Sequence, residues 1–350
     1  MENHRFIGYA CAYTPIALIH AAGFTPYRIL PNVDCPDHAG YMLHDNLCPH
    51  VKRILDRAMS NSIPKLEGMI LMNSCDAMRR LYDAFQKARP DINSVLIDLP
   101  VTVTQNSTLF FAQELQRLIS VLELWGQQRS IHSDTIEKSI QAYNDLSASF
   151  EKLRQKLRDG QLKNASARLQ EAYNKASCEP VEKTKEYLNM LITKAEVQPT
   201  DHGIPIFLFG NILPEPEAFS LFESCGASII GEDMCTGSRL FGEITINSNM
   251  DIIQNLAVSL LNRQPCARTF DGTDPGRLAR DIVSKAKQHN VKGVIGYTVK
   301  FCDPYIARLP AIRRALKTEN IPFVFIEGDC TLRSIGQQKT RIEAFIEMLR

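Results

Sequence analysis

The feature that most constrains the fold is a strand-helix unit that occurs twice, once in each half of the chain. The segment IGYACAYTPIALIHAAGF, which starts at Ile7, resembles FLFGNILPEPEAFSLFESCGA, which starts at Phe207. Further along, GMILMNSCDAMRRLYDAF, from Gly68, resembles GVIGYTVKFCDPYIARLPAIRRAL, from Gly293. Any two strand-turn-helix units share a general pattern. The shared order and the recurring Cys-Asp pair favour an internal duplication.

Apolar runs followed by amphipathic stretches are typical of strands and helices that alternate along a chain. We expect strands at residues 6–10, 69–72, 206–209, 228–231, 294–297 and 323–326. We expect helices at residues 15–22, 216–224 and 341–349. This alternation predicts an α/β fold with two similar strand-helix domains, each built on a parallel sheet covered by helices.

The middle of the chain has a different pattern. Between residues 107 and 197, apolar side chains recur on helical faces between charged ones, among them Phe110, Leu115, Leu118 and Tyr143. Gly160 and Pro180 interrupt the pattern, which indicates several helices. The sequence therefore predicts a first α/β domain at residues 1–106, a helical insert at 107–203, and a second α/β domain with a C-terminal helix at 204–350.

Bulk composition excludes some classes of partner. The chain has 40 Lys and Arg residues against 39 Asp and Glu, and no long block of one sign, so we expect no nucleic-acid partner. It begins with polar residues, and no run approaches the roughly 18 apolar residues of a membrane span, so we expect a cytoplasmic protein. The ten cysteines then need a role other than disulfides, because that compartment keeps thiols reduced.

Five of these cysteines follow predicted strands or precede predicted helices, and a sixth, Cys266, follows Pro265 in a loop. In open α/β sheets, ligands bind beyond the carboxyl ends of the strands. The first half contributes Cys11, Cys48 and Cys75, and the second half contributes Cys235, Cys266 and Cys302. A helix N-terminus favours a thiolate, which is the ligand of iron-sulfur clusters. The spacing lacks a CxxC motif, so a buried cysteine with a packing role is the alternative at each position.

Other cysteines leave alternatives open. Cys35 also follows a strand-like stretch and is an alternative to Cys11, and Cys330 is near a predicted strand. Cys178 and Cys225 are expected to serve in packing. A zinc site is a further alternative, because two of the cysteines share one loop with three histidines, namely Cys35, His38, His44, Cys48 and His50. We prefer the cluster interpretation, because surface histidines are commonly just solvated.

Flanking residues make a family resemblance specific. The blocks are CAYTPIALIHAAGFTPYRI, NLCPHVKRILDRA, GMILMNSCDAMRRLYDAF, FESCGASIIGEDMCTGSRLFG, LLNRQPCAR, FCDP and QQKTRIEAFIEML. In this order they resemble the successive blocks of the 2-hydroxyacyl-CoA dehydratase and benzoyl-CoA reductase family, and they span nearly the whole chain.

The resemblance implies a cofactor. Dehydratase subunits of this family hold one 4Fe-4S cluster by three cysteines, whereas double-cubane-cluster proteins use three cysteines from each of two domains. The presence of both cysteine sets resembles the double-cubane branch. It implies two 4Fe-4S cubanes, joined by a bridging sulfide and enclosed between the two domains. A single 4Fe-4S cluster is the alternative.

The resemblance also implies a function and partners. The chain has no GxxxxGK[ST] phosphate loop and no GxGxxG fingerprint. By resemblance, a separate ATP-hydrolysing activator with its own 4Fe-4S cluster would supply electrons, the substrate would be a small molecule, and the protein would be a homodimer. We expect a low-potential reductase. The alternatives are a subunit of a 2-hydroxyacyl-CoA dehydratase and a non-catalytic cluster assembly or delivery protein.

Polar residues near these cysteines leave the catalytic residues unassigned. Asp76 and Asp303 follow their cysteines directly, where capping a helix is the common use of Asp. Paired arginines recur at matching places in the two repeats: Arg79, Arg80, Arg313 and Arg314. The loop around Cys235 carries Glu232, Asp233, Ser238 and Arg239, which can satisfy cluster sulfides, bind substrate or simply form the loop.

Overall fold

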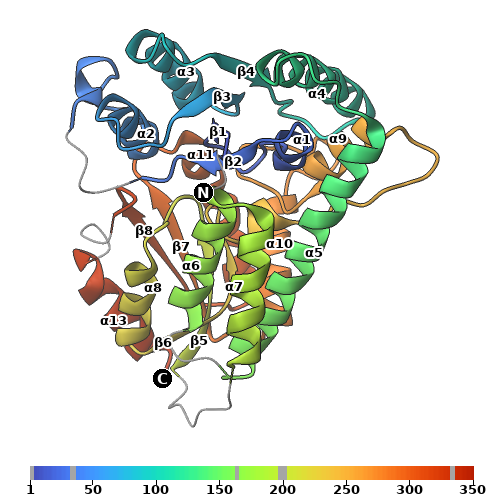
Figure 1. Cartoon of the computed structure of the whole chain (residues 1–350). Coiled ribbons are helices and arrows are strands. Elements are labelled where there is room, and N and C mark those ends of the chain that lie inside the picture. The colour runs from blue at the N-terminus through green and yellow to red at the C-terminus, as the bar shows by residue number, and fades with distance from the viewer. Residues whose placement is uncertain (1–3, 32–36, 162–164, 196–202, 332–335) are drawn as a thin grey trace. The chain divides into compact units, whose positions relative to one another are not determined.

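The computed structural model describes residues 4–31, 37–161, 165–195, 203–331 and 336–350. The chain forms two compact units. The first comprises Met1–Ser147, Ser177–Val181 and Phe241–Asp274, and the second comprises Ala148–Ala176, Glu182–Leu240 and Pro275–Arg350. Each unit contains one four-stranded sheet, as Figure 1 shows.

The sheet of the first unit has the order β2-β1-β3-β4, and all its strand pairs are parallel. Its strands are β1 (Phe6–Tyr9), β2 (Thr25–Arg28), β3 (Leu66–Asn73) and β4 (Ser94–Asp98). Residues 69–72 of β3 are fully buried, as expected for a central parallel strand covered on both faces. The helices of this unit are α1 (Ile16–Ala21), η1 (Ala39–Tyr41), α2 (Pro49–Met59), α3 (Asp76–Ala88), α4 (Gln105–Trp125) and α9 (Ile252–Asn262).

The sheet of the second unit repeats this design with the order β6-β5-β7-β8, again entirely parallel. Its strands are β5 (Ile204–Gly210), β6 (Ala227–Asp233), β7 (Gly293–Val299) and β8 (Phe323–Gly328). The helices around it are α8 (Pro216–Ser224), η2 (Ser238–Phe241), α10 (Arg277–Gln288), α11 (Asp303–Thr318) and α13 (Lys339–Met348). The two sheets thus place their strands in the same order along the chain, which confirms the predicted fold of two similar strand-helix domains.

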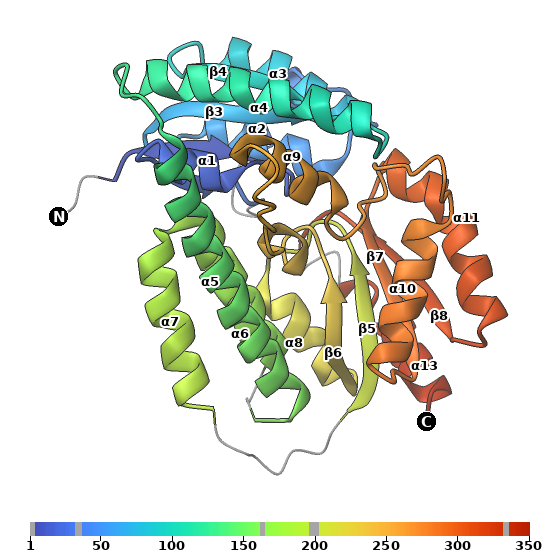
Figure 2. The same ribbon diagram turned by 90° about the vertical axis from the view of Figure 1, so that its right-hand side faces the viewer.

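Helices cover both faces of the second sheet. Ile206 and Leu208 of β5 pack with side chains of α8 and α13 in one buried cluster. Phe207 and Phe209 point to the opposite face, where they stack on His289 and Tyr305. Helices α10 and α11 lie side by side, as seen in Figure 2. This two-sided burial explains why β5 reads as a continuous apolar run.

Three further helices complete the middle of the chain. They are α5 (Ser133–Arg158), α6 (Ala165–Cys178) and α7 (Val181–Thr193). The boundary between the compact units falls inside α5, between Ser147 and Ala148, so residues 107–203 contribute to both units. The three-domain division stays a prediction, because compactness does not test whether the helical stretch is an insertion.

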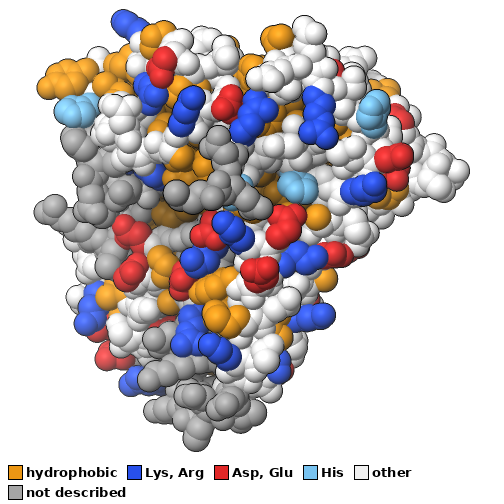
Figure 3. Space-filling view, in the orientation of Figure 1, with side chains coloured by type: hydrophobic (Ala, Val, Ile, Leu, Met, Phe, Trp, Pro, Cys, Tyr) orange, Lys and Arg blue, Asp and Glu red, His pale blue; other side chains and the backbone are white. Residues whose placement is uncertain are grey.

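The surface carries charges of both signs. Figure 3 shows Lys and Arg side chains interspersed with Asp and Glu on the visible face, as expected from the balanced composition. In the described part of the chain, no helix combines the length and the apolar character that crossing a membrane requires.

Candidate functional site

The carboxyl edge of the first sheet carries two of the predicted cysteines. Strands β1 and β3 are parallel neighbours, so the residues that follow them emerge at the same edge. Cys11 follows β1, and Cys75 follows β3 as the N-cap residue of α3. Both are partly exposed. The sheet therefore brings these two thiols to one edge of one unit, as its topology requires.

Arg268 lies across this edge and connects the ends of two strands. Its guanidinium donates to the carbonyl oxygen of Ser74 over 2.7 Å and to that of Asn73 over 3.2 Å. It also donates to the carbonyl oxygens of Leu99 and Pro100, which follow β4. Backbone oxygens at the ends of β3 and β4 thus fix the position of this partly buried cation.

Three cysteines act electrostatically on Arg268. Burial lowers the pKa of the guanidinium, and the nearby thiols of Cys11, Cys266 and Cys75 oppose that shift. The structure therefore brings Cys11, Cys75 and Cys266 into the neighbourhood of one positive charge. Cys266 was expected beside Cys235 and Cys302, but the segment Phe241–Asp274 that contains it belongs to the first unit.

Side-chain and backbone contacts hold the Cys266 loop at this edge. Arg263 donates to the carbonyl oxygen of Ala12 over 2.6 Å. Thr269 donates from its backbone and from its hydroxyl to the carbonyl oxygen of Cys266, over 3.0 and 2.9 Å. Phe270 forms a parallel bridge with Thr102. The loop is therefore anchored both before and after the cysteine.

Cys48 is the N-cap residue of α2 in the first unit and is 9% exposed. His50 follows on the same helix, buried, and neither of its ring nitrogens has a hydrogen-bond partner among the described residues. Burial, and then the charge of Arg28, lowers the pKa of His50 to about 3, so this imidazole is neutral. Buried ring nitrogens without a partner are rare in folded proteins, and these two lie two residues from a thiol.

The second unit repeats the Cys75 arrangement at Cys302. Cys302 follows β7 and is the N-cap residue of α11, as Cys75 is for α3. Burial raises the pKa of the Cys302 thiol, while hydrogen bonds from the Tyr305 backbone, Thr298 and Asn211 lower it, and the charge of Cys235 raises it. Cys302 and Cys235 are therefore close enough to interact.

Asn211 follows β5, at the position that Cys11 has after β1 in the sequence match. Its Oδ1 accepts from the backbone N–H groups of Ile212, over 2.7 Å, and of Val299, over 3.0 Å. Its Nδ2 donates to the Thr298 hydroxyl over 2.8 Å. Its carbonyl oxygen accepts from the Cys235 N–H over 2.9 Å. Asn211 therefore connects the ends of β5 and β7 to the cysteine loop.

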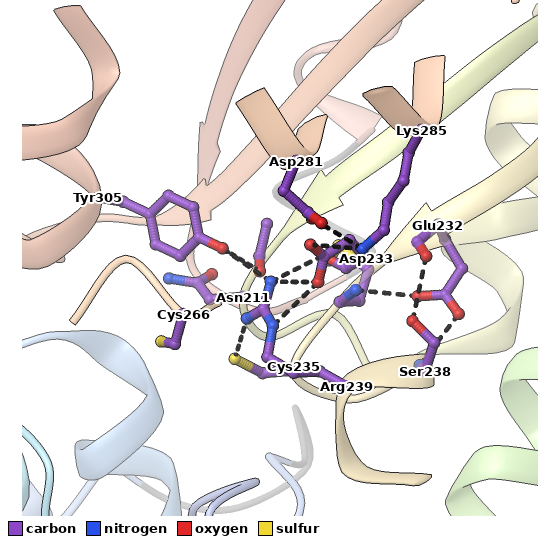
Figure 4. A network of polar contacts seen from close by, with 12 residues as sticks. Asn211, Glu232, Asp233, Cys235, Ser238, Arg239, Cys266, Asp281, Lys285 and Tyr305 are labelled. Carbon is purple, nitrogen blue, oxygen red and sulfur yellow. Dashed lines mark hydrogen bonds and ion pairs between the residues drawn. The ribbon is translucent and has the colours of Figure 1, made fainter. Parts of the chain in front are cut away.

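A buried ion pair lies beside Cys235, as Figure 4 shows. Arg239 donates from Nε to Asp233 Oδ1 over 2.9 Å and from Nη1 to Cys235 Sγ over 2.8 Å. Its Nη2 reaches Asp233 and the hydroxyl of Tyr305, which in turn donates to the carbonyl oxygen of Gly210 over 2.7 Å. The sulfur of Cys235 thus accepts a charge-assisted hydrogen bond.

The remaining cysteines have local packing environments. The Cys178 thiol donates to the carbonyl oxygen of Arg28 over 3.3 Å, and burial raises its pKa. Cys225 is buried in the apolar cluster of the second sheet. Cys330 is buried, and its backbone N–H donates to the Tyr297 hydroxyl over 3.2 Å. Cys35 lies outside the described residues.

The donor chemistry suits an iron-sulfur cluster, because thiols lie near the buried guanidinium of Arg239, the partly buried guanidinium of Arg268 and the imidazole of His50, which lacks a hydrogen-bond partner within the described part of the chain. Among the described residues, no three side chains of His, Cys, Asp or Glu form a group that could hold a metal ion. Of the residues of the zinc alternative, Cys35 lies outside the described residues, and His38, His44, Cys48 and His50 form no such group. The thiols and guanidinium groups are thus of the kinds that an iron-sulfur cluster needs. The assignment of three cysteines to each cluster stays a prediction.

Sequence reasoning missed three residues of these sites. Arg268, Asn211 and Tyr305 contact elements that are far away along the chain. The sequence could have pointed to Arg268, because it lies two residues after Cys266 in the block LLNRQPCAR. It could also have pointed to Asn211, because Asn211 aligns with Cys11 when the two repeats are matched.

Comparisons with known proteins identify the class. Residues 11–349 match the model of the family described as 2-hydroxyglutaryl-CoA dehydratase, D-component, so the chain belongs to that family. It is thus an enzyme of the 2-hydroxyacyl-CoA dehydratase family, as the sequence motifs predicted.

Named relatives match over nearly their whole length. The chain is 26% identical to the (R)-phenyllactyl-CoA dehydratase beta subunit of Clostridium sporogenes, a match that covers 99% of this chain and 92% of that one. It is 26% identical to the (R)-2-hydroxyglutaryl-CoA dehydratase beta subunit of Acidaminococcus fermentans, covering 99% and 93%. It is 22% identical to a subunit of the benzoyl-CoA reductase of Thauera aromatica, covering 96% and 89%.

Proposed function

We propose that the chain is an iron-sulfur-dependent, low-potential reductase whose two units carry two 4Fe-4S cubanes. The proposed ligands are Cys11, Cys48, Cys75, Cys235, Cys266 and Cys302. The observation that carries the proposal is the repetition of Cys75 at Cys302, each at the start of the helix that follows the third strand of its sheet. If these two residues served only in packing, nothing would require a cysteine at both of the equivalent positions.

The surrounding residues have roles that suit such a site. A bound 4Fe-4S cluster supplies single electrons at low potential. Arg268 and Arg239 place positive charge near the cysteines and offset the negative charge that thiolates bring into partly buried positions. Helices α3 and α11 begin directly after Cys75 and Cys302, and their N-termini favour negative charge. Asn211 and Thr298 orient the Cys302 sulfur through hydrogen bonds.

A source of electrons is part of the proposal. The sequence has neither a phosphate loop nor a dinucleotide fingerprint. We therefore propose an ATP-hydrolysing activator protein with its own 4Fe-4S cluster as the electron donor, and a homodimer as the form it reduces. The substrate class is a small molecule that is hard to reduce, such as a CoA thioester.

A second candidate function is favoured by the names of the relatives. Two of them are beta subunits of dehydratases that act on 2-hydroxyacyl-CoA compounds. In that case the chain is one subunit of a heterodimeric dehydratase with a single cluster. Water loss from a 2-hydroxyacyl-CoA, in the presence of a second homologous subunit, is the activity this candidate predicts.

Iron and acid-labile sulfide analysis of anaerobically prepared protein separates these candidates. The first predicts about eight irons per chain, since each of two cubanes contains four. About four irons, together with dehydration of 2-hydroxyacyl-CoA substrates by a two-subunit preparation, supports the second. Protein that stays free of iron after reconstitution contradicts both.

A further inference from the structure

The ion pair of Asp233 and Arg239 stands out because it is buried and also touches a thiol. The two side chains are 1% and 0% exposed. A buried pair of this kind offsets its desolvation only with well-placed additional hydrogen bonds. Those bonds are present, and one of them ends on the sulfur of Cys235.

The orientation of the Arg239 guanidinium is fixed by groups other than Cys235. Its Nε donates to Asp233 Oδ1 over 2.9 Å, and its Nη2 donates to the Asp233 carbonyl oxygen over 3.1 Å and to the Tyr305 hydroxyl over 3.0 Å. Since the guanidinium is planar and rigid, these contacts determine where Nη1 points. Nη1 lies 2.8 Å from Cys235 Sγ.

The anchors of Arg239 come from β6 and α11, and residues of α10 and β5 support those anchors. Asp233 ends β6, and its Oδ2 lies 3.8 Å from Nζ of Lys285 on α10. Tyr305 lies on α11 and is held by the carbonyl oxygen of Gly210, the last residue of β5. The position of Nη1 is therefore defined before any ligand reaches Cys235.

Glu232 fixes the turn that carries Cys235 from its other side. Its carboxylate accepts from the backbone N–H groups of Met234, over 2.9 Å, and of Ser238, over 3.0 Å. The Ser238 hydroxyl donates to the Glu232 carbonyl oxygen over 3.1 Å. Residues 233 to 239 thus form a turn that is pinned at both ends, so the cysteine cannot leave the guanidinium without breaking these bonds.

We propose that Arg239 is the positioning residue of Cys235, which it holds by a charge-assisted N–H···S bond in the orientation that binds a soft metal. The bond withdraws electron density from the sulfur and stabilises a metal-thiolate at that position. Applied to an iron-sulfur centre, this inference rests on the proposed function. Applied to a single thiol-binding cation such as Cd²⁺, it is independent of the proposed function.

The first arm of the test uses Cd²⁺ alone, added to the metal-free protein, with the sulfur-to-cadmium absorbance as the readout. Cys235→Ser should remove part of this absorbance. The part that is lost is the signal of cadmium bound to Cys235. Arg239→Gln should weaken the Cys235-dependent binding roughly 10- to 100-fold, the range seen when partners of metal ligands are removed. Arg239→Lys should not restore this binding, because an ammonium group lacks the planar, rigid set of N–H donors that a guanidinium has.

Arg89→Gln is the control for the loss of a partly buried arginine that lies away from Cys235. Arg89 belongs to the first unit, donates to the carbonyl oxygen of Ala58 over 2.8 Å and pairs with Asp91. Its replacement should lower thermal stability while Cd²⁺ affinity stays unchanged. Equal Cd²⁺ affinity of wild type and Arg239→Gln would overturn the inference, and so would full recovery with Arg239→Lys or no effect of Cys235→Ser.

The second arm uses the reconstituted iron-sulfur protein. Arg239→Gln should shift the reduction potential to more negative values, because the sulfur loses a hydrogen-bond donor, and Arg89→Gln should not. If the wild type holds no iron but the cadmium arm succeeds, the proposed function fails and the role of Arg239 stands. The wild type can also be loaded with iron while Arg239→Gln changes neither the reduction potential nor the cadmium affinity. In that case the proposed function stands and the role of Arg239 fails.

Discussion

Cys75 and Cys302 occupy the same place in two different sheets, each as the N-cap residue of the helix that follows the third strand in the sheet order. The strands before them, β3 and β7, are the central neighbours of β1 and β5. The duplication predicted from the sequence therefore extends from the order of strands to the position of a thiol. The surroundings differ, because Arg268 lies near Cys75, whereas Thr298 and Asn211 bind Cys302.

Gly210→Ala should destabilise the second unit strongly. A Cβ at this position would lie 1.7 Å from the Tyr297 carbonyl oxygen, which is backbone that cannot swing away. Overpacking costs about 1 to 3 kcal/mol and occasionally more, and a contact with rigid backbone places Gly210→Ala at the upper end of that range. The free energy of unfolding in urea measures the effect. Gly40→Ala is the control, since nothing lies within 4 Å of a Cβ there. Equal losses in both variants would refute the assigned backbone contact.

Asn211→Ala should lower the free energy of unfolding by about 2 kcal/mol, because the buried N–H groups of Ile212 and Val299 lose their acceptor. Thr298→Val removes only one partner of Asn211, so its effect should be smaller. A double-mutant cycle between the two positions should give a coupling energy of about 0.5 kcal/mol or more. Strict additivity would contradict the direct bond.

Arg268→Gln should destabilise the first unit by about 3 kcal/mol, because carbonyl oxygens at the ends of β3 and β4 lose their donor. Hydrogen exchange should show the loosening at residues 73–74 and 99–100, and not in the second sheet. Arg53→Gln is the comparison, since Arg53 forms a 3.7 Å ion pair with the buried Asp56 of α2, whose carboxylate also accepts from the N–H groups of His38 and Ala39. A similar exchange pattern in both variants would argue against the assigned role of Arg268.

His289 should make stability depend on pH. Burial lowers its pKa below the usual 6.5, so the folded state disfavours the charged form. The stabilisation is complete above the unfolded pKa and is lost as pH falls below it, because the unfolded chain then binds the proton more readily. Unfolding free energies at about pH 7.5 and about pH 5.5 should therefore differ less in His289→Gln than in the wild type. Identical differences would show that His289 does not contribute.

The sequence was sufficient to predict the strands that are apolar on both faces. The runs at residues 69–72, 206–209 and 294–297 fall inside β3, β5 and β7, which are internal strands of their sheets. Strand β2 gave no such signal, because it contains Pro26 and the buried Arg28. Proline is tolerated there since β2 lies at the edge of its sheet.

The candidate site was predictable only in part. Cys75 and Cys302 follow apolar runs directly, so local pattern placed them at helix starts. Cys266 was assigned to the second half by its position in the sequence, whereas its segment packs within the first unit. Arg268 could not be placed from local sequence, because it donates to carbonyl oxygens of residues more than 160 positions away.

The central claim is that each unit contributes its own cluster ligands. Iron content per chain, measured after anaerobic reconstitution of Cys75→Ala and Cys302→Ala, tests this most directly, with Cys225→Ala as the control for loss of a packed cysteine. The account predicts that each of the first two variants retains about half of the wild-type iron and that the control retains all of it. Full iron content in Cys75→Ala or in Cys302→Ala would contradict the account.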